Sequence, residues 1–199
     1  MITIIILAAG SSSRMRGRDK LLEKIDDIPL LRQQALAALA VSNDVIITLP
    51  PAPHPRYHTV SDLNVSPLSV KDATEGISAS IRTAIKSLSQ KTTKAMLLLA
   101  DLPEITQIEL NTVIAAINSH PNQLVWRGAT KDGKPGHPIV FDQSLFNRLM
   151  QLTGDNGGQS IINEVKNDVR LVRLSSNQAR LDLDTPEEWD AWRLTKCRT

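Results

Sequence analysis

The sequence is poor in cysteine and in aromatic residues, and each shortage excludes a class of protein. The single cysteine, Cys197, allows no internal disulfide and no thiolate metal site. Aromatic residues make up 3% of the chain, too few for the stacking platforms that bind single-stranded nucleic acids. At 199 residues the chain is long enough to bury one sizeable hydrophobic core. We therefore expect a domain stabilised by aliphatic packing.

The chain also lacks an excess of charge of one sign and lacks a long apolar run. It has 23 basic and 21 acidic residues, so no broad basic face is available for nucleic acid or for a membrane surface. The longest apolar stretch covers residues 4–9, far below the roughly 20 residues of a spanning helix, and no basic segment precedes it. We expect a cytoplasmic protein without nucleic-acid or membrane partners.

Three continuous apolar runs predict strands of a parallel sheet, because such strands are covered on both faces and do not alternate with polar residues. They cover residues 4–7, 45–49 and 95–100. Helical spacing follows the first two runs, over residues 30–39 and 77–88. This alternation predicts an α/β domain with three layers, α/β/α, around a mostly parallel central sheet.

The second half of the sequence carries two helix-start signals. Thr106 with Glu109 and Thr185 with Glu188 have the spacing of a capping box. Residues 50–55 contain four prolines, which predicts a loop or a surface excursion. We interpret the chain as one domain, residues 1–199, with parts at about 1–105 and 106–199. Shorter elements are predicted as strands at 124–126, 138–141 and 169–174, and as helices at 145–152 and 160–165.

The segment after the first predicted strand has the composition of an anion-binding loop. Ala8, Ala9 and Gly10 leave the backbone N–H groups accessible, and Ser11 begins a run of three hydroxyl donors. Four cationic side chains follow within seven positions, and fixed cations beside backbone donors are how proteins hold polyphosphates. The alternative is a structural loop with a solvated basic face. The cationic residues are Arg14, Arg16, Arg18 and Lys20.

Two acidic positions are candidates for a metal site. Asp101 stands at the end of an apolar run, at the sheet edge where ligands of open α/β sheets bind. One or two carboxylates beside phosphate oxygens are enough for Mg²⁺. The alternative for Asp101 is a turn or a helix cap. Asp182 and Asp184 alternate around one residue, so only one is expected to face the same site, and an acid there also stabilises a helix start.

Two further groups are candidates for binding. Gly76 and Ser78 precede a predicted helix whose N–H groups suit a nucleotide or an acceptor, and the alternative is N-capping by Ser78. We assign His137 to substrate binding or loop shape, because an isolated histidine between a glycine and a proline, here Gly136 and Pro138, is more often a turn or hydrogen-bonding residue than a general base.

Six blocks of the sequence together resemble a known family. They are LAAGSSSRMRGRDKLL at 7–22, EGISASIRTAI at 75–85, LLLADLP at 97–103, GKPGHPIVF at 133–141, TGDNGGQSI at 153–161 and DLDTPEEW at 182–189. In this order they resemble the molybdenum cofactor cytidylyltransferase (MocA-like) branch of the MobA-like NTP transferases. GKPGHP is the block most specific to that branch. The common spacing RMGxxK has one additional residue here before Lys20, which predicts a bulged loop.

The resemblance implies a Rossmann-like nucleotidyltransferase that transfers CMP from CTP to the phosphate of molybdenum-molybdopterin, with Mg²⁺ and release of pyrophosphate. It implies that Arg14, Lys20 and Asp101 are catalytic and that Asp101 and Asp184 hold the metal. It makes the part at about 1–105 the nucleotide half and the part at about 106–199 the acceptor half. It places the nucleotide on Leu7, Ala8, Ala9, Gly10, Ser11, Arg14, Lys20, Gly76 and Ser78, and the acceptor on Gly136, His137 and Pro138. A molybdoenzyme or its maturation chaperone is the implied protein partner.

Three other interpretations remain open at this stage. The first is a guanylyltransferase that uses GTP on the same acceptor, although Ala9 is the residue that the resemblance associates with CTP. The second is nucleotidyl transfer to another phosphorylated small molecule. The third is a nucleotide-binding regulatory or chaperone module without chemistry, and the presence of both Lys20 and Asp101 speaks against it.

Overall fold

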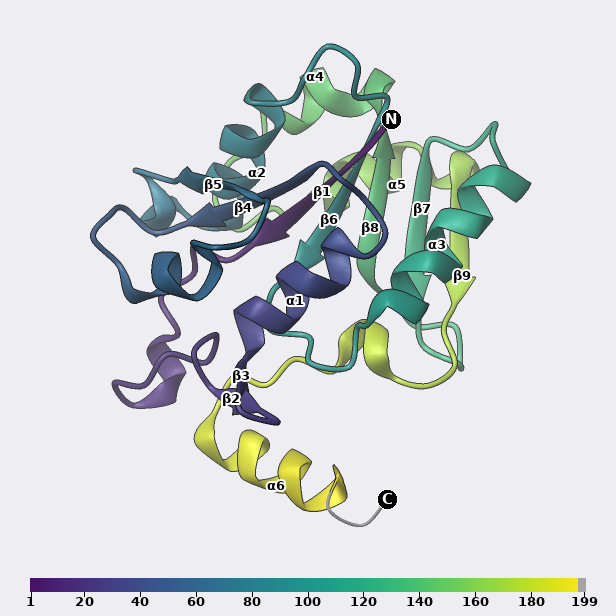
Figure 1. Cartoon of the computed structure of the whole chain (residues 1–199). Helices are drawn as coiled ribbons and strands as arrows, with labels where there is room; N and C mark the ends of the chain where they lie inside the picture. The colour runs from purple at the N-terminus through teal and green to yellow at the C-terminus, as the bar shows by residue number, and fades with distance from the viewer. Residues whose placement is uncertain (197–199) are drawn as a thin grey trace.

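A seven-stranded sheet forms the centre of the computed structural model, which describes residues 1–196 (Figure 1). The order of its strands is β5-β4-β1-β6-β8-β7-β9. A two-stranded hairpin, β2 (Lys24–Ile25) and β3 (Ile28–Pro29), lies outside it. The strands of the central sheet are β1 (Ile2–Leu7), β4 (Val45–Leu49), β5 (Ser66–Ser69), β6 (Lys94–Leu99), β7 (Val125–Ala129), β8 (Pro135–Asp142) and β9 (Val169–Arg173).

One strand of the sheet runs against the others. β1 pairs in parallel with both β4 and β6, so that Ile4 lies opposite Val45 on one side and Met96 on the other. β8 is antiparallel to β6 and to β7, whereas β9 is again parallel to β7. The start of β8 therefore lies at the same edge of the sheet as the carboxyl ends of β1, β6 and β7.

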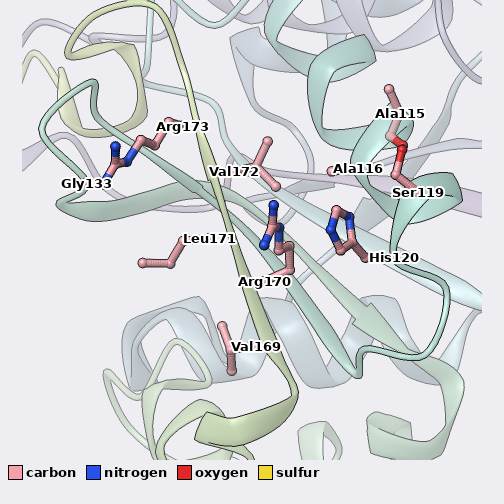
Figure 2. A pocket seen from close by; sticks show the side chains of 10 residues that line it. All are labelled: Ala115, Ala116, Ser119, His120, Gly133, Val169, Arg170, Leu171, Val172 and Arg173. Carbon is pink, nitrogen blue, oxygen red and sulfur yellow. The ribbon is translucent and has the colours of Figure 1, made fainter.

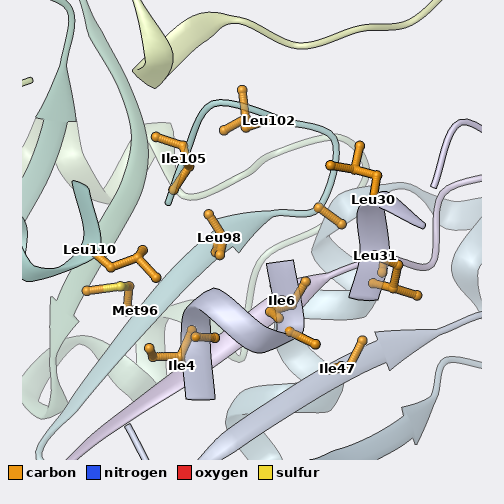
Figure 3. Packing of buried hydrophobic residues seen from close by; sticks show 14 of the residues in the cluster. Ile4, Ile6, Leu30, Leu31, Ile47, Met96, Leu98, Leu102, Ile105 and Leu110 are labelled. Atoms are coloured by element: carbon orange, nitrogen blue, oxygen red, sulfur yellow. The ribbon is translucent and has the colours of Figure 1, made fainter. Parts of the chain in front are cut away.

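Helices cover both faces of the sheet, which confirms the predicted three-layer α/β/α fold. The core on one face lies under α1 (Leu30–Leu39) and α3 (Gln107–Ser119), and Figure 3 shows its aliphatic side chains interdigitating. The core on the other face lies under α2 (Ile77–Lys86), α4 (Phe146–Leu149) and α5 (Gln159–Glu164). The last helix, α6 (Pro186–Lys196), packs Trp189 and Trp192 against the first core.

Both predicted capping boxes are present. The Thr106 hydroxyl accepts a hydrogen bond from the Ile108 N–H at 3.2 Å, and the Thr106 N–H donates to the Glu109 carboxylate at 2.9 Å. At the start of α6, the Thr185 N–H donates to Glu188 at 3.0 Å. These bonds satisfy N–H groups that no preceding helical turn can satisfy. They therefore fix where α3 and α6 begin, a few residues after Asp101 and Asp184.

Several predicted boundaries were wrong. The helix expected over residues 145–152 is only the four residues of α4, preceded by a 3₁₀ turn at Gln143–Leu145. The strand expected at 138–141 extends over the whole of β8. Strand β5 and the β2–β3 hairpin were not predicted, because they are short and do not alternate. β5 contains Pro67, which an edge strand tolerates because one of its sides has no partner.

Among residues 1–196, no helix combines the length and the apolar character needed to cross a membrane. The predictions about Cys197 fall outside the described residues.

Candidate functional site

A cleft of about 870 Å³ lies at the edge where β1 and β6 end. Residues from the first predicted loop, from the start of α2, from the end of β6 and from the segment before α6 all contribute to its walls. The structure thus brings together segments that are more than 80 residues apart in the sequence. The predicted site residues that line the cleft are Leu7, Ala8, Ala9, Gly10, Ser11, Arg14, Lys20, Gly76, Asp101 and Asp184.

Lys20 joins the two predicted metal-binding acids inside this cleft. Its Nζ donates to Asp101 Oδ2 at 2.5 Å and to Asp184 Oδ1 at 2.6 Å. Arg14 donates to the other oxygen of Asp184. The additional residue in the loop therefore does not prevent Lys20 from reaching the acids. Asp184 lines the cleft and Asp182 does not, which answers the question that the sequence left open.

The electrostatics of this cluster favour the charged forms of Lys20 and Asp184. Burial acts to lower the pKa of Lys20, but the charge of Asp101 and the hydrogen bonds to both acids raise it overall. For Asp184, burial acts to raise the pKa, and the hydrogen bond and charge of Lys20, with the charge of Arg14, lower it overall. At neutral pH the cluster is a network of ion pairs.

Asp101 has one oxygen with no partner. Its Oδ1 is buried and forms no hydrogen bond within residues 1–196, although the lysine occupies Oδ2. A buried carboxylate oxygen without a donor is costly unless a ligand satisfies it. Within the described residues no group of three or more histidine, cysteine, aspartate or glutamate side chains is arranged to hold a metal. Asp101 and Asp184 nevertheless supply two carboxylates, and one or two are enough for Mg²⁺ beside phosphate oxygens.

The loop after β1 exposes its backbone to the cleft. The Ala8 N–H is bonded to the Thr48 carbonyl at 3.0 Å, which continues the sheet register by one residue. Beyond it, a Cβ added at Gly10 would meet nothing within 4 Å, so the space beside this residue is open. Ser12 and Arg16 have positive φ values of 53° and 52° on either side of a 3₁₀ turn, Ser13–Met15. The loop is thus bulged, as its additional residue predicted.

The start of α2 is fastened to the segment 154–156. Gly76 has a φ of +120°, and a Cβ there would lie 2.3 Å from Asp155 Oδ1. Ser78 is fully buried, and its hydroxyl donates to the carbonyl of Gly154. This corrects the prediction for Ser78, which neither lines the cleft nor caps the helix: Gly76 is the N-cap residue, and Ser78 holds the loop against α2.

Gly136, His137 and Pro138, the predicted acceptor residues, begin β8 beside the end of β6 and do not line the cleft. A Cβ at Gly136 would lie 2.0 Å from the carbonyl oxygen of Ala179, so only glycine allows this close approach. His137 Nδ1 lies 3.5 Å from the Leu97 carbonyl. Burial lowers the pKa of His137 to about 4, so the imidazole is neutral at pH 7.

A second cleft, of about 720 Å³, lies between α3 and the edge strand β9 (Figure 2). Its walls include His120, Arg170 and Arg173, and no carboxylate belongs to its lining. None of the predicted site residues contributes to it. Of the two clefts, the one beside β1 and β6 combines cations, carboxylates and exposed backbone, which is the set that phosphate and metal binding require.

Comparisons with known proteins show the family of the chain. The sequence matches the family model of the MobA-like NTP transferase domain over residues 4–170. The chain belongs to this family. It is a family of nucleotidyltransferases, and the matched range includes the loop after β1, Lys20 and Asp101 but ends before Asp184.

Solved structures resemble this NTP transferase along most of its length. Rv0371c from Mycobacterium tuberculosis H37Rv is 27% identical, with a TM-score of 0.81 over 96% of this chain and 95% of that one. The same protein in complex with manganese is 25% identical, with a TM-score of 0.77 and 96% coverage of both chains. A nucleotidyl transferase from Methanothermobacter thermautotroptrophicus shares the fold, at 18% identity, a TM-score of 0.80 and coverage of 100% and 98%. No curated protein matched in a separate search.

Sequence reasoning missed Arg56, the residue that holds the loop after β1 of this transferase in place. Arg56 is 1% exposed, and its guanidinium donates to the carbonyls of Ala8 and Gly10 at 2.6 and 2.7 Å. It also donates to the Ser12 hydroxyl at 3.0 Å and to both carboxylate oxygens of Asp19 at 2.7 Å. One side chain thus ties the beginning of the loop to its end.

The carboxylate of Asp19 completes this arrangement. Burial acts to raise the pKa of Asp19, but the hydrogen bond from Arg56 and its charge lower it overall, so the carboxylate remains ionised. No motif links Arg56 and Asp19, which are 37 residues apart. Pro50, Pro51 and His54 also line the cleft. The proline-rich segment is therefore part of the site, and composition alone indicated only a surface excursion.

Proposed function

We propose that this transferase is a Mg²⁺-dependent cytidylyltransferase that transfers CMP from CTP to the terminal phosphate of molybdenum-molybdopterin. The observation that carries the proposal is the bridge from Lys20 to Asp101 and Asp184, beside the open backbone of Gly10. The six blocks of the MocA-like branch support the choice of nucleotide and acceptor, and Ala9 supports CTP over GTP.

Asp101 and Asp184 are the residues that would hold Mg²⁺. The buried Oδ1 of Asp101 has no donor within the described residues, which fits a cation ligand. The manganese complex of Rv0371c supports a divalent cation in a related protein. When bound, Mg²⁺ neutralises negative charge on the phosphate oxygens as pyrophosphate departs.

Arg14 and Lys20 would hold the β- and γ-phosphates. In the structure both cations are engaged by Asp184, and Lys20 also by Asp101. Triphosphate binding therefore exchanges these carboxylate partners for phosphate oxygens. The backbone of the exposed residues Gly10 and Ser11 supplies neutral donors at the same place, and such fixed donors stabilise charge that develops during transfer.

The reaction needs no side-chain base. An oxygen of the acceptor phosphate is already anionic and forms a bond to the α-phosphorus, while the bond between the α-phosphorus and the bridging oxygen breaks and pyrophosphate takes the electron pair. His137, neutral at pH 7 and half-buried, orients the start of β8 and does not transfer a proton. Catalysis in this proposal rests on positioning and on electrostatics.

The first test is thermal unfolding with Mg²⁺ and each of CTP, GTP, ATP and UTP. A ligand at 100 times its Kd stabilises by about 2.7 kcal/mol, which raises the midpoint by roughly 5–10 °C for a domain of this size. We expect a Mg²⁺-dependent shift with CTP. Asp101→Asn should lose the Mg²⁺ dependence, whereas the exposed Asp132→Asn keeps it as a matched control.

The outcomes of this test separate the alternatives. A shift with GTP alone assigns the protein to guanylyl transfer on the same acceptor. A shift with CTP but no pyrophosphate release on addition of the pterin acceptor points to another phosphorylated small molecule. Absence of a shift with every nucleotide contradicts the proposal. A molybdoenzyme or its maturation chaperone is the partner that we propose for release of the product.

A further inference from the structure

One half-buried arginine of the acceptor half has no carboxylate partner. Four arginines in residues 1–196 form no salt bridge, namely Arg127, Arg170, Arg173 and Arg180. The last three are exposed to water, which can hydrate their charge. Arg127, in β7, is the one that is half-buried. A cation removed from water without an anion is unfavourable, and this makes Arg127 an exception in the molecule.

Arg127 and a second arginine, Arg180, are hydrogen-bonded to neutral groups. Its Nε donates to the Gly136 carbonyl at 3.1 Å, and its Nη1 donates to the side-chain oxygen of Gln159 at 2.8 Å. Arg180 donates from Nη1 to the neighbouring carbonyl, that of Pro135, at 3.0 Å. Within the described residues the Nη2 atoms of both arginines form no hydrogen bond. The two guanidinium groups are thus hydrogen-bonded at the start of β8, and the Nη2 donors of both are not in use.

The two positive charges oppose each other. Burial lowers the pKa of Arg127, and the charge of Arg180 lowers it further. The two arginines are hydrogen-bonded to the consecutive carbonyls of Pro135 and Gly136, and neither forms a salt bridge within the described residues. An anion bound between them would remove both the repulsion and the unsatisfied donors.

This pair lies on the opposite side of β6 from the nucleotide loop. In the sheet order, β1 leads into the nucleotide loop, β6 leads to Asp101, β8 begins with residues 135–137 and β7 carries Arg127. By this order, Asp101 at the end of β6 follows a strand that lies between β1, which leads to Arg14 and Lys20, and β8, whose first carbonyls bind Arg127 and Arg180.

We propose that Arg127 and Arg180 form the binding site for the phosphate monoester of the acceptor. The Nη2 groups of the two arginines, which donate to nothing within the described residues, suit the oxygens of a tetrahedral dianion. The site rests on the proposed function for its place in the reaction, but its anion chemistry does not depend on the nucleotide. The acceptor phosphate would then approach Asp101 from the side opposite the triphosphate.

Inorganic phosphate is the probe that tests this site without nucleotide or pterin. Because phosphate also has access to the triphosphate loop, we would measure its Kd by calorimetry at constant ionic strength in an Arg14→Gln background. Adding Arg127→Gln should weaken phosphate binding by at least about tenfold, as expected for loss of a charged hydrogen bond. Adding Arg180→Gln, an exposed change that the fold tolerates, should weaken it in the same direction.

Two controls separate the site from general charge and from folding. Arg170→Gln removes an exposed arginine, also without a carboxylate, that lines the other cleft with α3, and it should leave the Kd of phosphate unchanged. In phosphate-free buffer, Arg127→Gln should leave the unfolding midpoint equal or higher, because it relieves repulsion. A purely structural arginine would lower that midpoint. Arg127→Lys keeps the charge but loses the fork, so its phosphate affinity should be intermediate.

The proposal is overturned if Arg127→Gln leaves the phosphate Kd unchanged, or if Arg14→Gln by itself removes all phosphate binding. Failure of CTP to bind, with an Arg127-dependent phosphate site intact, overturns the proposed function and not this site. In turnover, Arg127→Gln should raise the KM of the acceptor at least about tenfold and leave the KM of CTP unchanged.

Discussion

The cations beside the loop after β1 and the two arginines at the start of β8 have different kinds of partner. In the first group, Arg14, Lys20 and Arg56 all bind carboxylates, and Arg56 is completely enclosed. In the second, Arg127 and Arg180 bind carbonyls and an amide oxygen and form no salt bridge within the described residues. Under the proposed function, substrate binding would exchange the partners of Arg14 and Lys20 and would give Arg127 and Arg180 their first anionic partner.

The largest effect on turnover should come from substitutions of Asp101 and Lys20. Asp101→Asn should abolish turnover almost completely with the fold retained, because the carboxylate is replaced where the cation would bind. Lys20→Ala should reduce turnover by about 10²–10³, as for loss of one preorganised donor. Steady-state kinetics with circular dichroism as a folding control measures both. Full activity of Asp101→Asn at ordinary Mg²⁺ would contradict the metal assignment, and undiminished turnover of Lys20→Ala would contradict its role.

The next largest effect is on the free energy of unfolding and should come from substitution of the buried Arg56. Arg56→Ala leaves the largely buried Asp19 carboxylate without its partner and should cost about 3–5 kcal/mol of unfolding free energy. Arg32→Ala, which breaks the more exposed pair with Asp62, should cost much less in the same urea titration, because water screens this pair.

A double variant distinguishes positioning by Arg56 from simple stabilisation. Arg56→Met with Asp19→Asn removes both charges and should recover much of the lost stability. It cannot recover the bonds to the carbonyls of Ala8 and Gly10, so the KM of CTP should stay raised. A double variant with normal CTP affinity would show that Arg56 serves the fold alone.

Substitutions at two glycines, Gly136 and Gly10, test the two regions separately. Gly136→Ala should cost about 2–3 kcal/mol of stability, because its Cβ would meet the Ala179 carbonyl and the backbone must move. Gly10→Ala should leave the unfolding midpoint unchanged, because its Cβ would enter open space. In the proposed function that space receives the nucleotide, so CTP affinity should fall about tenfold, equivalent to about 1.4 kcal/mol. Unaltered CTP affinity in Gly10→Ala would place the nucleotide elsewhere.

The smallest expected effect is the pH dependence from His137. The pKa of a histidine is about 6.5 in the unfolded chain and about 4 here, so the unfolded chain binds more protons between these values. Stability should therefore fall as the pH falls from about 6.5 towards 4, by about 1–2 kcal/mol between pH 7 and pH 5. His137→Asn should flatten this part of a plot of unfolding free energy against pH. If the slope of that plot is unchanged in His137→Asn, groups other than His137 cause the pH dependence.

The sequence predicted those parts of the fold in which one local pattern decides the structure. The runs that became β1, β4 and β6 are apolar throughout because both faces of these strands are covered. The helix starts at Thr106 and Thr185 depend on bonds within four residues. Strand β5 could not be found in this way, because its pairing with β4 determines it and its own composition does not.

The same division holds within the candidate site. The loop after β1, Asp101 and Asp184 follow from motifs at the ends of elements, and all of them line one cleft. Arg56 meets the loop only through the tertiary fold, and so does Ser78 in its contact with Gly154. Arg127 carries no local signal either, because its distinguishing property is the lack of an acid nearby. Burial and missing partners can be read only from the folded molecule.

The ion pairs of Lys20 have a consequence for how salt acts on this enzyme. Dissolved salt screens a triphosphate from Lys20, but it equally screens Asp101 and Asp184, with which the triphosphate competes. The two effects oppose each other, so CTP affinity should vary little with ionic strength. No carboxylate among residues 1–196 pairs with Arg127 or Arg180, so screening there would act on the ligand alone. The two substrates would then respond differently to the same change of buffer, with the acceptor the more sensitive.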